Sequence, residues 1–506
     1  MTAPQALGRR ALLRGALAAG TVAAVPAALS MAASAAEIAP VDVNLHLLKR
    51  ATYGPTPAAL DEARAMGMTA WLDAQLNPAS LDDPVADELL TRWPMLSSTA
   101  AEVRAAYPNG NWAVMYALRE ATVARAAWSR RQLLELMVDF WANHLNVPNP
   151  SSEVWDVRHL YDRDVIRAHA LGRFADMLVA SAKHPAMLRY LDNANSTKNK
   201  PNENYARESL ELHTVGVEAG YTEQDVKQAA LLLTGFTVTG TDWTYAFVPS
   251  RHHVGPITVM GFGHPNATAA GGEAAAVEYL GYLARHPATA RRIAHKLVER
   301  FVTDAPPPPL VEWLAQVYLQ NDTRIAPVLR ALFLTTWFVA SPGQKARLPF
   351  EDVVASVRIL GIGPEPTGVD GVKYLVSAAN NVGQPPQGWA APNGYPQVAG
   401  AWSSSSSTVA RWNLHYSLAT ASQGRTLAHP ARASWLPTPL PATHGELVDA
   451  LCDRLLQRRS AAKRDALCAY LGVTPSTKLT ATSTAATSKL QTLVAMLLDT
   501  PDFFLR

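Results

Sequence analysis

The chain has 506 residues, of which 48% are hydrophobic and 17% charged, so it can bury a large core and is not a disordered polyelectrolyte. Its 45 Lys and Arg against 42 Asp and Glu give a net charge of +3. Residues 1–35 hold three arginines and no acid, which leaves the rest of the chain balanced at 42 against 42. No dense basic run remains in that part, which argues against a nucleic-acid partner.

The N-terminal segment has the features of an export signal. Arg9-Arg10-Ala11-Leu12-Leu13 resembles the twin-arginine signal, an Ala-rich apolar run follows over 15–31, and Ala33-Ser34-Ala35 is an A-x-A cleavage site. We expect residues 1–35 to be a cleaved twin-arginine signal peptide and the remainder to be extracellular, periplasmic or cell-wall associated. The alternative is a membrane anchor. No later stretch of about 20 apolar residues could span a bilayer.

Helical periodicity dominates the remaining residues, 36–506, and predicts a mainly α fold. Apolar residues recur at three- and four-residue spacing over 57–76, 99–128, 131–145, 164–191, 223–234, 273–284, 287–302, 309–319, 324–334, 347–360, 445–470 and about 485–498. Thr222 and Asp225 have the spacing of a capping box. Aromatic and β-branched residues cluster over 236–260 and predict one small hairpin. We expect one large multi-helix domain with this insertion, and a C-terminal subdomain from about residue 340 as an option.

Cys452 and Cys468 lie in the C-terminal helical region. In an exported protein they could form one disulfide, or remain as two buried thiols. Two cysteines cannot build a thiolate metal cage.

Residues 201–216 carry a local excess of ionisable and amide groups. Pro201 suits the first turn of a helix, and Gly216 suits a position just past its end. The groups between them are Asn202, Asn204, Glu203, Arg207, Glu208, Glu211 and His213. Two interpretations stay open: an exposed ladder of salt bridges, or a site with Glu208, Glu211 and His213 as catalytic groups beside Asn202, Asn204 and Arg207.

The string NENYARESLELHTVG over 202–216 resembles the DUF1800 family, a bacterial domain of unknown function. Further strings match in order: RATYGPTP at 50–57, DFWANHLNV at 139–147, YTEQDV at 221–226, LTGF at 233–236, HPATARRIAHKL at 286–297, GQPPQGWAAPNGYP at 383–396 and LLDTPDFF at 497–504. The resemblance covers nearly the whole chain after about residue 40. It implies a mostly helical exported protein and implies no reaction.

Histidines elsewhere could join the 201–216 segment. His144 follows an apolar helix and sits beside Asn143, where free helix-end carbonyls can orient an imidazole. His252 lies in the β-like region, at a place where the resemblance implies a histidine. With Glu208, Glu211 and His213 they could hold a divalent cation such as Zn²⁺, Mn²⁺ or Fe²⁺, although no metal motif of fixed spacing occurs.

A third group of candidates is aromatic and amide-bearing. Gln384, Trp389, Asn393, Tyr395 and Trp402 lie in a Pro-, Gly- and Ser-rich stretch. Such loops bind flat sugar rings or protein partners, or they simply anchor an irregular loop on the core.

These features favour an exported hydrolase acting on a polysaccharide or other envelope polymer, with Glu208 or Glu211 among the acids and the histidines orienting or binding. A non-catalytic envelope binding or assembly protein is the second hypothesis. A metal-dependent oxidoreductase is the third, because twin-arginine export permits a cofactor loaded in the cytoplasm.

Overall fold

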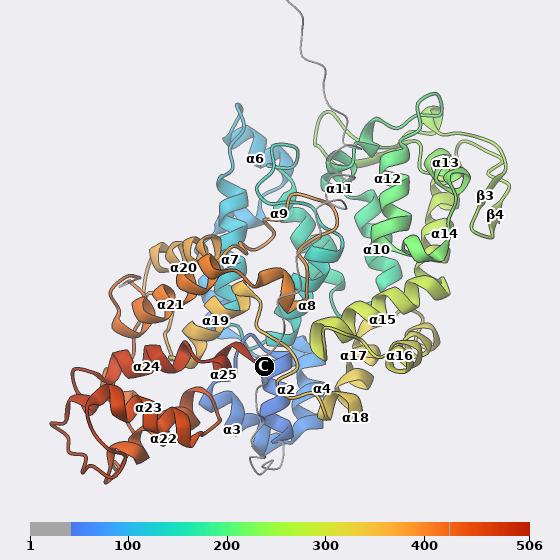
Figure 1. Cartoon of the computed structure of the whole chain (residues 1–506). Coiled ribbons are helices and arrows are strands. Elements are labelled where there is room, and N and C mark those ends of the chain that lie inside the picture. The colour runs from blue at the N-terminus through green and yellow to red at the C-terminus, as the bar shows by residue number, and fades with distance from the viewer. Residues whose placement is uncertain (1–41, 425) are drawn as a thin grey trace, which may run out of the picture. The chain divides into compact units, whose positions relative to one another are not determined.

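A computed structural model describes residues 42–424 and 426–506, and residues 42–506 form one compact unit (Figure 1). The expected signal peptide lies outside the described residues, and the subdomain from about residue 340 stays a prediction. The described part is mainly helical, as the periodicity predicts. None of its helices is both long and apolar enough to cross a membrane.

Most of the helices are α-helices; short 3-10 turns lie between some of them, and two segments are π-helical, η3 (Asp162–Arg167) and η5 (Ser209–His213). In the first half of the chain they are α2 (Val43–Ala51), α3 (Pro57–Met66), α4 (Met68–Leu76), α5 (Pro84–Leu90), α6 (Ala100–Ala106), α7 (Ala113–Trp128), α8 (Gln132–His144), α9 (Arg158–Tyr161), α10 (Phe174–Lys183), α11 (Pro185–Tyr190), α12 (Glu203–Glu208) and α13 (Glu223–Leu232). In the second half they are α14 (Gly272–Arg285), α15 (Pro287–Phe301), α16 (Pro308–Gln320), α17 (Ile325–Phe333), α18 (Thr336–Val339), α19 (Pro349–Ile359), α20 (Asp370–Asn381), α21 (Ser405–Thr420), α22 (His444–Leu455), α23 (Ala461–Leu471), α24 (Leu490–Leu498) and α25 (Pro501–Phe504).

Several long periodic stretches are broken where glycine or proline interrupts them. The stretch 57–76 splits at Gly67, whose φ of 82° ends α3 and begins α4. The stretch 164–191 splits before Pro185, which starts α11. Periodicity therefore locates the helical regions, and these local breakers set their boundaries.

The β-like region forms two hairpins, where the sequence analysis expects one. Strands β1 (Phe236–Val238) and β2 (Tyr245–Phe247) pair antiparallel, and so do β3 (Ile257–Val259) and β4 (Phe262–His264). Each strand is three residues long. The Thr222–Asp225 capping box is present at the start of α13.

Three helices are central to the two pockets and the ion network of this molecule. α8 and α15 contribute side chains to one pocket, and α19 contacts both α7 and α21 (Figure 1). One large apolar cluster runs through the unit, and Val103, Val114 and Met115 form a small separate cluster. In the C-terminal helices Cys452 and Cys468 are buried, free thiols.

A buried ion network ties α15, α19 and the last residue together. Glu351 lies 2.9 Å from Arg300 and 2.9 Å from Arg506, and all three side chains are at most 2% exposed. Burial opposes ionisation, but the two guanidinium groups hold the pKa of Glu351 below its usual value. Glu351 is therefore the shared anion of two buried cations.

We expect Glu351→Gln to destabilise the fold by about 3–5 kcal/mol, because it leaves two buried guanidinium groups without their common anion. Chemical denaturation measures the change. The matched control is Glu312→Gln, which removes an exposed pair 4.0 Å from Arg291 and should cost less than about 1 kcal/mol. Equal effects of the two substitutions would show that the network contributes no more than a surface pair.

Candidate active site

The C-terminal end of α8 holds the 389–397 loop through amide side chains. Asn143 donates from Nδ2 to the carbonyl of Tyr395 at 2.8 Å, and its Oδ1 accepts from the Tyr395 amide at 2.5 Å. Asn146 donates to the carbonyls of Trp389 and Ala391 at 2.9 and 2.7 Å. A side-chain amide presents one donor and one acceptor, so Asn143 pairs with the loop as a neighbouring strand would.

Gly394 allows this close approach. Its φ is 72°, in the left-handed region, and a Cβ built there would overlap the carbonyl oxygen of Asn143. The loop can lie against α8 only because this position has no side chain.

Aromatic rings stiffen the same loop. The indole N–H of Trp389 donates to Asn393 Oδ1 at 2.8 Å, and its ring lies 5.0 Å from that of Tyr395. Trp402 packs behind, with its ring 5.7 Å from Tyr395 and its N–H on the Pro396 carbonyl at 3.0 Å. The loop therefore presents fixed rings and amides rather than mobile ones.

Together α8, α15 and this loop enclose a pocket of about 370 Å³. It combines aromatic, amide and charged side chains from segments far apart in the sequence. Its lining is Phe140, Asn143, His144, Lys296, Glu299, Trp389, Asn393, Gly394, Tyr395, Pro396 and Gln397. The structure thus brings together five of the candidates from the sequence analysis: Asn143, His144, Trp389, Asn393 and Tyr395.

A hydrogen-bond chain crosses the wall of this pocket. His144 Nε2 lies 3.0 Å from the carbonyl oxygen of His213, and His144 Nδ1 lies 3.0 Å from Lys296 Nζ. A carbonyl oxygen can only accept, so we assign the ring proton to Nε2. Nδ1 is then an acceptor, and Lys296 donates to it.

The charges around this chain favour neutral forms. Burial, together with the cations of Lys296 and Arg292, pushes the pKa of His144 well below its usual value. Burial and the neighbouring Arg292 lower the pKa of Lys296 to about 7, against the opposing effect of Glu299. Lys296 therefore exchanges between ammonium and amine near neutral pH. One N–H of its Nζ is donated to His144, and the other N–H groups, or the lone pair of the amine, can face the pocket.

The 201–216 segment supports this wall without lining the pocket. His213 is buried, and its pKa falls to about 3 because of burial and the charges of Lys296 and Arg292. The π-helical turn of η5 ends at His213, whose carbonyl holds His144. Glu208 and Glu211 do not line the pocket.

Glu208 and Glu211 form a half-buried carboxylate pair on α12 and η5. Glu211 accepts a hydrogen bond from the Tyr221 hydroxyl at 2.9 Å. Burial, reinforced by the charge of Glu211, raises the pKa of Glu208 to about 7. Near neutral pH the Glu208 carboxyl is therefore about half protonated.

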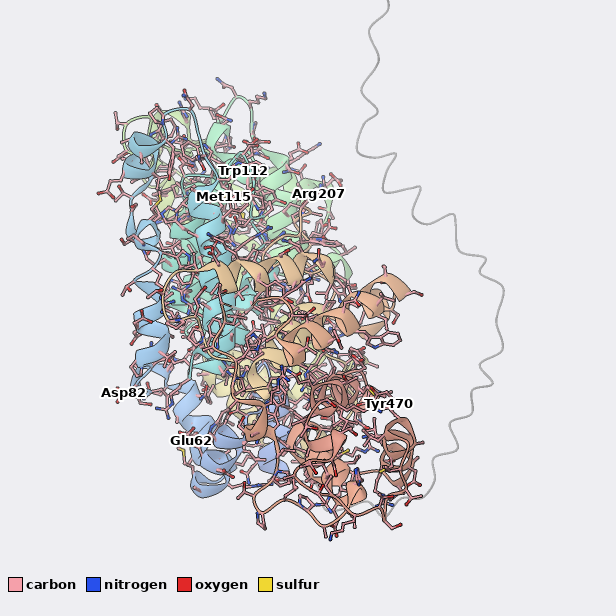
Figure 2. The ribbon with its side chains drawn as sticks, turned by 90° about the vertical axis from the view of Figure 1, so that its left-hand side faces the viewer. Glu62, Asp82, Trp112, Met115, Arg207 and Tyr470 are labelled. Atoms are coloured by element: carbon pink, nitrogen blue, oxygen red, sulfur yellow. The ribbon has the colours of Figure 1, made fainter. Side chains whose placement is uncertain are left out.

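The other candidates of this segment make structural contacts. Asn202 caps α12 by accepting from the Tyr205 amide at 3.1 Å, and it donates to the Leu191 carbonyl at 2.8 Å. Arg207, labelled in Figure 2, pairs with Glu223 at 2.6 Å, and Asn204 is exposed.

Two further candidates lie away from the pocket lining. His252 is buried between the Thr234 carbonyl and Asn266 Oδ1, each 2.9 Å from a ring nitrogen. Gln384 is buried and accepts from the Phe350 amide at 3.0 Å, in the first turn of α19. Both hold backbone segments in place.

Sequence reasoning missed Lys296, Glu299 and Gln397. The string HPATARRIAHKL contains Lys296, but an isolated lysine in an amphipathic helix reads as a solvated side chain. Among residues 42–424 and 426–506, no three His, Cys, Asp or Glu side chains gather in a way that could hold a metal ion.

We expect Gly394→Ala to destabilise the protein by more than the about 1–2 kcal/mol that a left-handed backbone costs an L-residue, because its Cβ also overlaps Asn143. Thermal and urea unfolding measure this. Gly343→Ala is the control, since Gly343 has a φ of 74° and open space around its Cβ position. If both variants lose the same stability, the loop does not depend on contact with α8.

We expect the raised pKa of Glu208 to make the free energy of unfolding depend on pH. Its pKa is raised in the folded state, so folding binds a proton between about pH 4.5 and 7, and stability falls as pH rises through this window. Gln mimics the protonated form. Glu208→Gln should therefore raise Tm at pH 8 and leave it nearly unchanged at pH 4. Glu203→Gln, on the exposed side of α12, should show no such pH-dependent gain.

The comparisons with known proteins give one result. The family model described as "Protein of unknown function (DUF1800)" matches residues 46–505. No curated protein and no solved structure matches the chain. The match covers nearly all of the described residues, including every segment that builds the pocket, and the chain belongs to the DUF1800 family.

Proposed function

We propose that this protein is an enzyme that cleaves a carbohydrate polymer outside the cytoplasm, with Lys296 as the proton-transferring group of the α8–α15 pocket. The supporting observation is a partly buried lysine with a pKa of about 7, hydrogen-bonded to a neutral imidazole inside a pocket. A strongly shifted ionisable group in a concave site is a mark of acid–base catalysis.

His144 would fix where the Lys296 nitrogen points. Its Nδ1 accepts a hydrogen bond from Lys296 Nζ, and its Nε2–H donates to the carbonyl oxygen of His213. When Lys296 is an amine, its lone pair is left to take a proton from the attacking water molecule, and when it is an ammonium, it can give that proton to the leaving oxygen.

One carboxyl group, that of Glu299, would act beside Lys296 in the proposed reaction. Glu299 lies one helical turn after Lys296 on α15 and lines the same pocket. Because Glu208 and Glu211 lie outside the lining, the proposal gives Glu299 the role of the second group. Lys296, as the amine, would take a proton from a water molecule whose oxygen bonds to the anomeric carbon as the bond from that carbon to the leaving oxygen breaks. The resulting ammonium would give the proton to the leaving oxygen, directly or through water, and the Glu299 carboxyl group would stabilise the positive charge that develops at the anomeric carbon.

The lining suits a sugar ring. Trp389, Tyr395 and Phe140 offer apolar faces, while Asn393 and Gln397 offer amide groups for hydroxyls. An exported protein would meet such polymers in the cell envelope, as the N-terminal sequence of the chain predicts.

The test uses Lys296→Arg. Arginine keeps the positive charge but stays protonated, so it cannot accept a proton at neutral pH. We expect turnover on a panel of envelope polysaccharides, measured by the release of reducing ends, to fall at least about 100-fold. In the unsubstituted protein, turnover limited by the Lys296 base should rise with pH to a plateau above about 7.

Lys373→Arg, a change at an exposed lysine paired with Asp370, is the matched control and should keep full turnover. Retained turnover and an unchanged pH profile in Lys296→Arg would overturn the catalytic role of Lys296.

A non-catalytic polymer-binding protein is the second candidate, favoured by the aromatic and amide loop. It predicts that Trp389→Ala weakens binding to an immobilised polysaccharide while Lys296→Arg leaves binding unchanged and no polysaccharide is cleaved. Cleavage by the unsubstituted protein would exclude it.

A further inference from the structure

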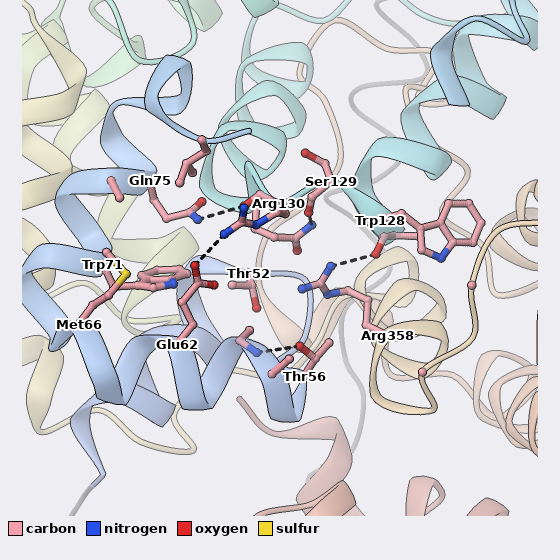
Figure 3. Close-up of a pocket in the computed structure, with 18 of the residues that line it drawn as sticks. Thr52, Thr56, Glu62, Met66, Trp71, Gln75, Trp128, Ser129, Arg130 and Arg358 are labelled. Atoms are coloured by element: carbon pink, nitrogen blue, oxygen red, sulfur yellow. Dashed lines mark hydrogen bonds and ion pairs between the residues drawn. The ribbon is translucent and has the colours of Figure 1, made fainter. Parts of the chain in front are cut away.

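A second pocket, distinct from the Lys296 site, lies between α3, α4, the end of α7 and α19 (Figure 3). Its volume is about 430 Å³, in the range of small-molecule sites. Trp71, Met66 and Trp128 form its apolar walls. The RATYGPTP string, which the proposed function leaves unexplained, contributes Thr52 and Thr56 to the lining.

Arg358 is the unusual group of this pocket. Its Nε donates to the Gly54 carbonyl at 2.8 Å and its Nη1 to the Ala127 carbonyl at 2.9 Å. Within residues 42–424 and 426–506, no carboxylate lies at ion-pair distance from it, and neither of these two hydrogen bonds uses its Nη2. Figure 3 shows the guanidinium directed toward Thr52, across from Glu62 and Trp71.

The neighbouring charges do not compensate Arg358. Glu62 pairs with Arg130 at 2.7 Å, and this pair is neutral as a whole. Gln75 donates to the Arg130 carbonyl at 3.0 Å, and Ser129 donates to Asp83 at 2.5 Å. The polar lining is thus engaged within the protein, and the pocket keeps a net charge of about +1 from Arg358.

Burial lowers the pKa of Arg358 to about 10, so the group remains a cation at neutral pH. A cation taken out of water without a counter-charge is unfavourable, and an anion that supplies that charge gains both ion pairing and a charge-assisted hydrogen bond.

We propose that this pocket binds a small amphipathic carboxylate, with its head group on Arg358 and its apolar body against Trp71, Met66 and Trp128. The fork of the guanidinium is already half engaged by two backbone carbonyls, which fixes its orientation before the ligand arrives. The apolar walls then select the chain or ring that follows the head group. The site does not depend on the proposed enzymatic role of Lys296.

The probe is decanoate, compared with 1-decanol and decyltrimethylammonium, which share its chain and differ in head-group charge. Isothermal titration calorimetry on the purified protein should show decanoate binding at least about ten-fold more tightly than decanol, and the cationic probe more weakly still. Equal affinities for the three probes would overturn the proposal, since they would leave the Arg358 charge without a role.

Arg358→Gln should remove the preference for decanoate over decanol. Arg330→Gln, at an exposed arginine paired with Asp73, is the matched control and should keep it. The double substitution Glu62→Gln/Arg130→Gln should also keep it, because it removes this pair as a neutral unit and leaves the charge of Arg358 in the pocket. A preference for decanoate that survives Arg358→Gln would contradict the proposal.

Because Arg358 also holds two backbone carbonyls, Arg358→Gln could fold poorly. The head-group comparison on the unsubstituted protein then decides the question alone, and Arg358→Lys, which keeps the charge, should retain part of the preference.

Discussion

The pairing of Asn143 and Asn146 with the 389–397 loop is the constraint on which the rest of the candidate site depends. Asn143 lies in the last turn of α8 and Asn146 just beyond its C-cap Leu145, and both meet the same stretch of loop. Each hydrogen bond contributes about 0.5–1.5 kcal/mol on balance, yet together they decide whether Trp389, Asn393 and Tyr395 face Lys296.

The C-terminal end of α8 also orients the proposed proton-transferring group, Lys296. His144 follows Asn143 directly, and its ring is held between the His213 carbonyl and Lys296. The loop and the imidazole are therefore positioned by consecutive residues of a single helix terminus. The 201–216 segment supports the site through the His213 carbonyl at the end of its π-helical turn, which holds the His144 ring. Its acidic side chains do not line the pocket.

Two pairs of cations in this molecule differ in what faces them. Arg300 and Arg506 are compensated by Glu351, and their burial is a feature of stability. Lys296 and Arg358 face pockets, and among residues 42–424 and 426–506 neither has a carboxylate at ion-pair distance. The first loses part of its charge near neutral pH and the second keeps it, because an ammonium is deprotonated far more readily than a guanidinium. This difference is why we assign acid–base chemistry to one pocket and anion binding to the other.

Much of the fold and part of the site could be predicted from the sequence. Helical periodicity and the Thr222–Asp225 capping box are local signals, read within a few residues, and both appear in the structure. The count of hairpins could not be predicted, because three-residue strands leave too short a pattern. Lys296 could not be recognised, because a lysine on α15 becomes a perturbed base only when tertiary packing buries it beside His144 of α8; the charge of Arg292, one turn earlier on α15, adds to the shift.

The sequence by itself determined the helical class, the family and the residue types available for chemistry, since these follow from local composition and from strings read in order. Only the tertiary structure decided which of them meet. Asn143, His144 and Tyr395 converge with Lys296, whereas Glu208, Glu211 and His252 do not line that pocket. The physical reason is that proximity across a hundred or more residues, and the desolvation that comes with it, depends on how helices pack and carries no local signal.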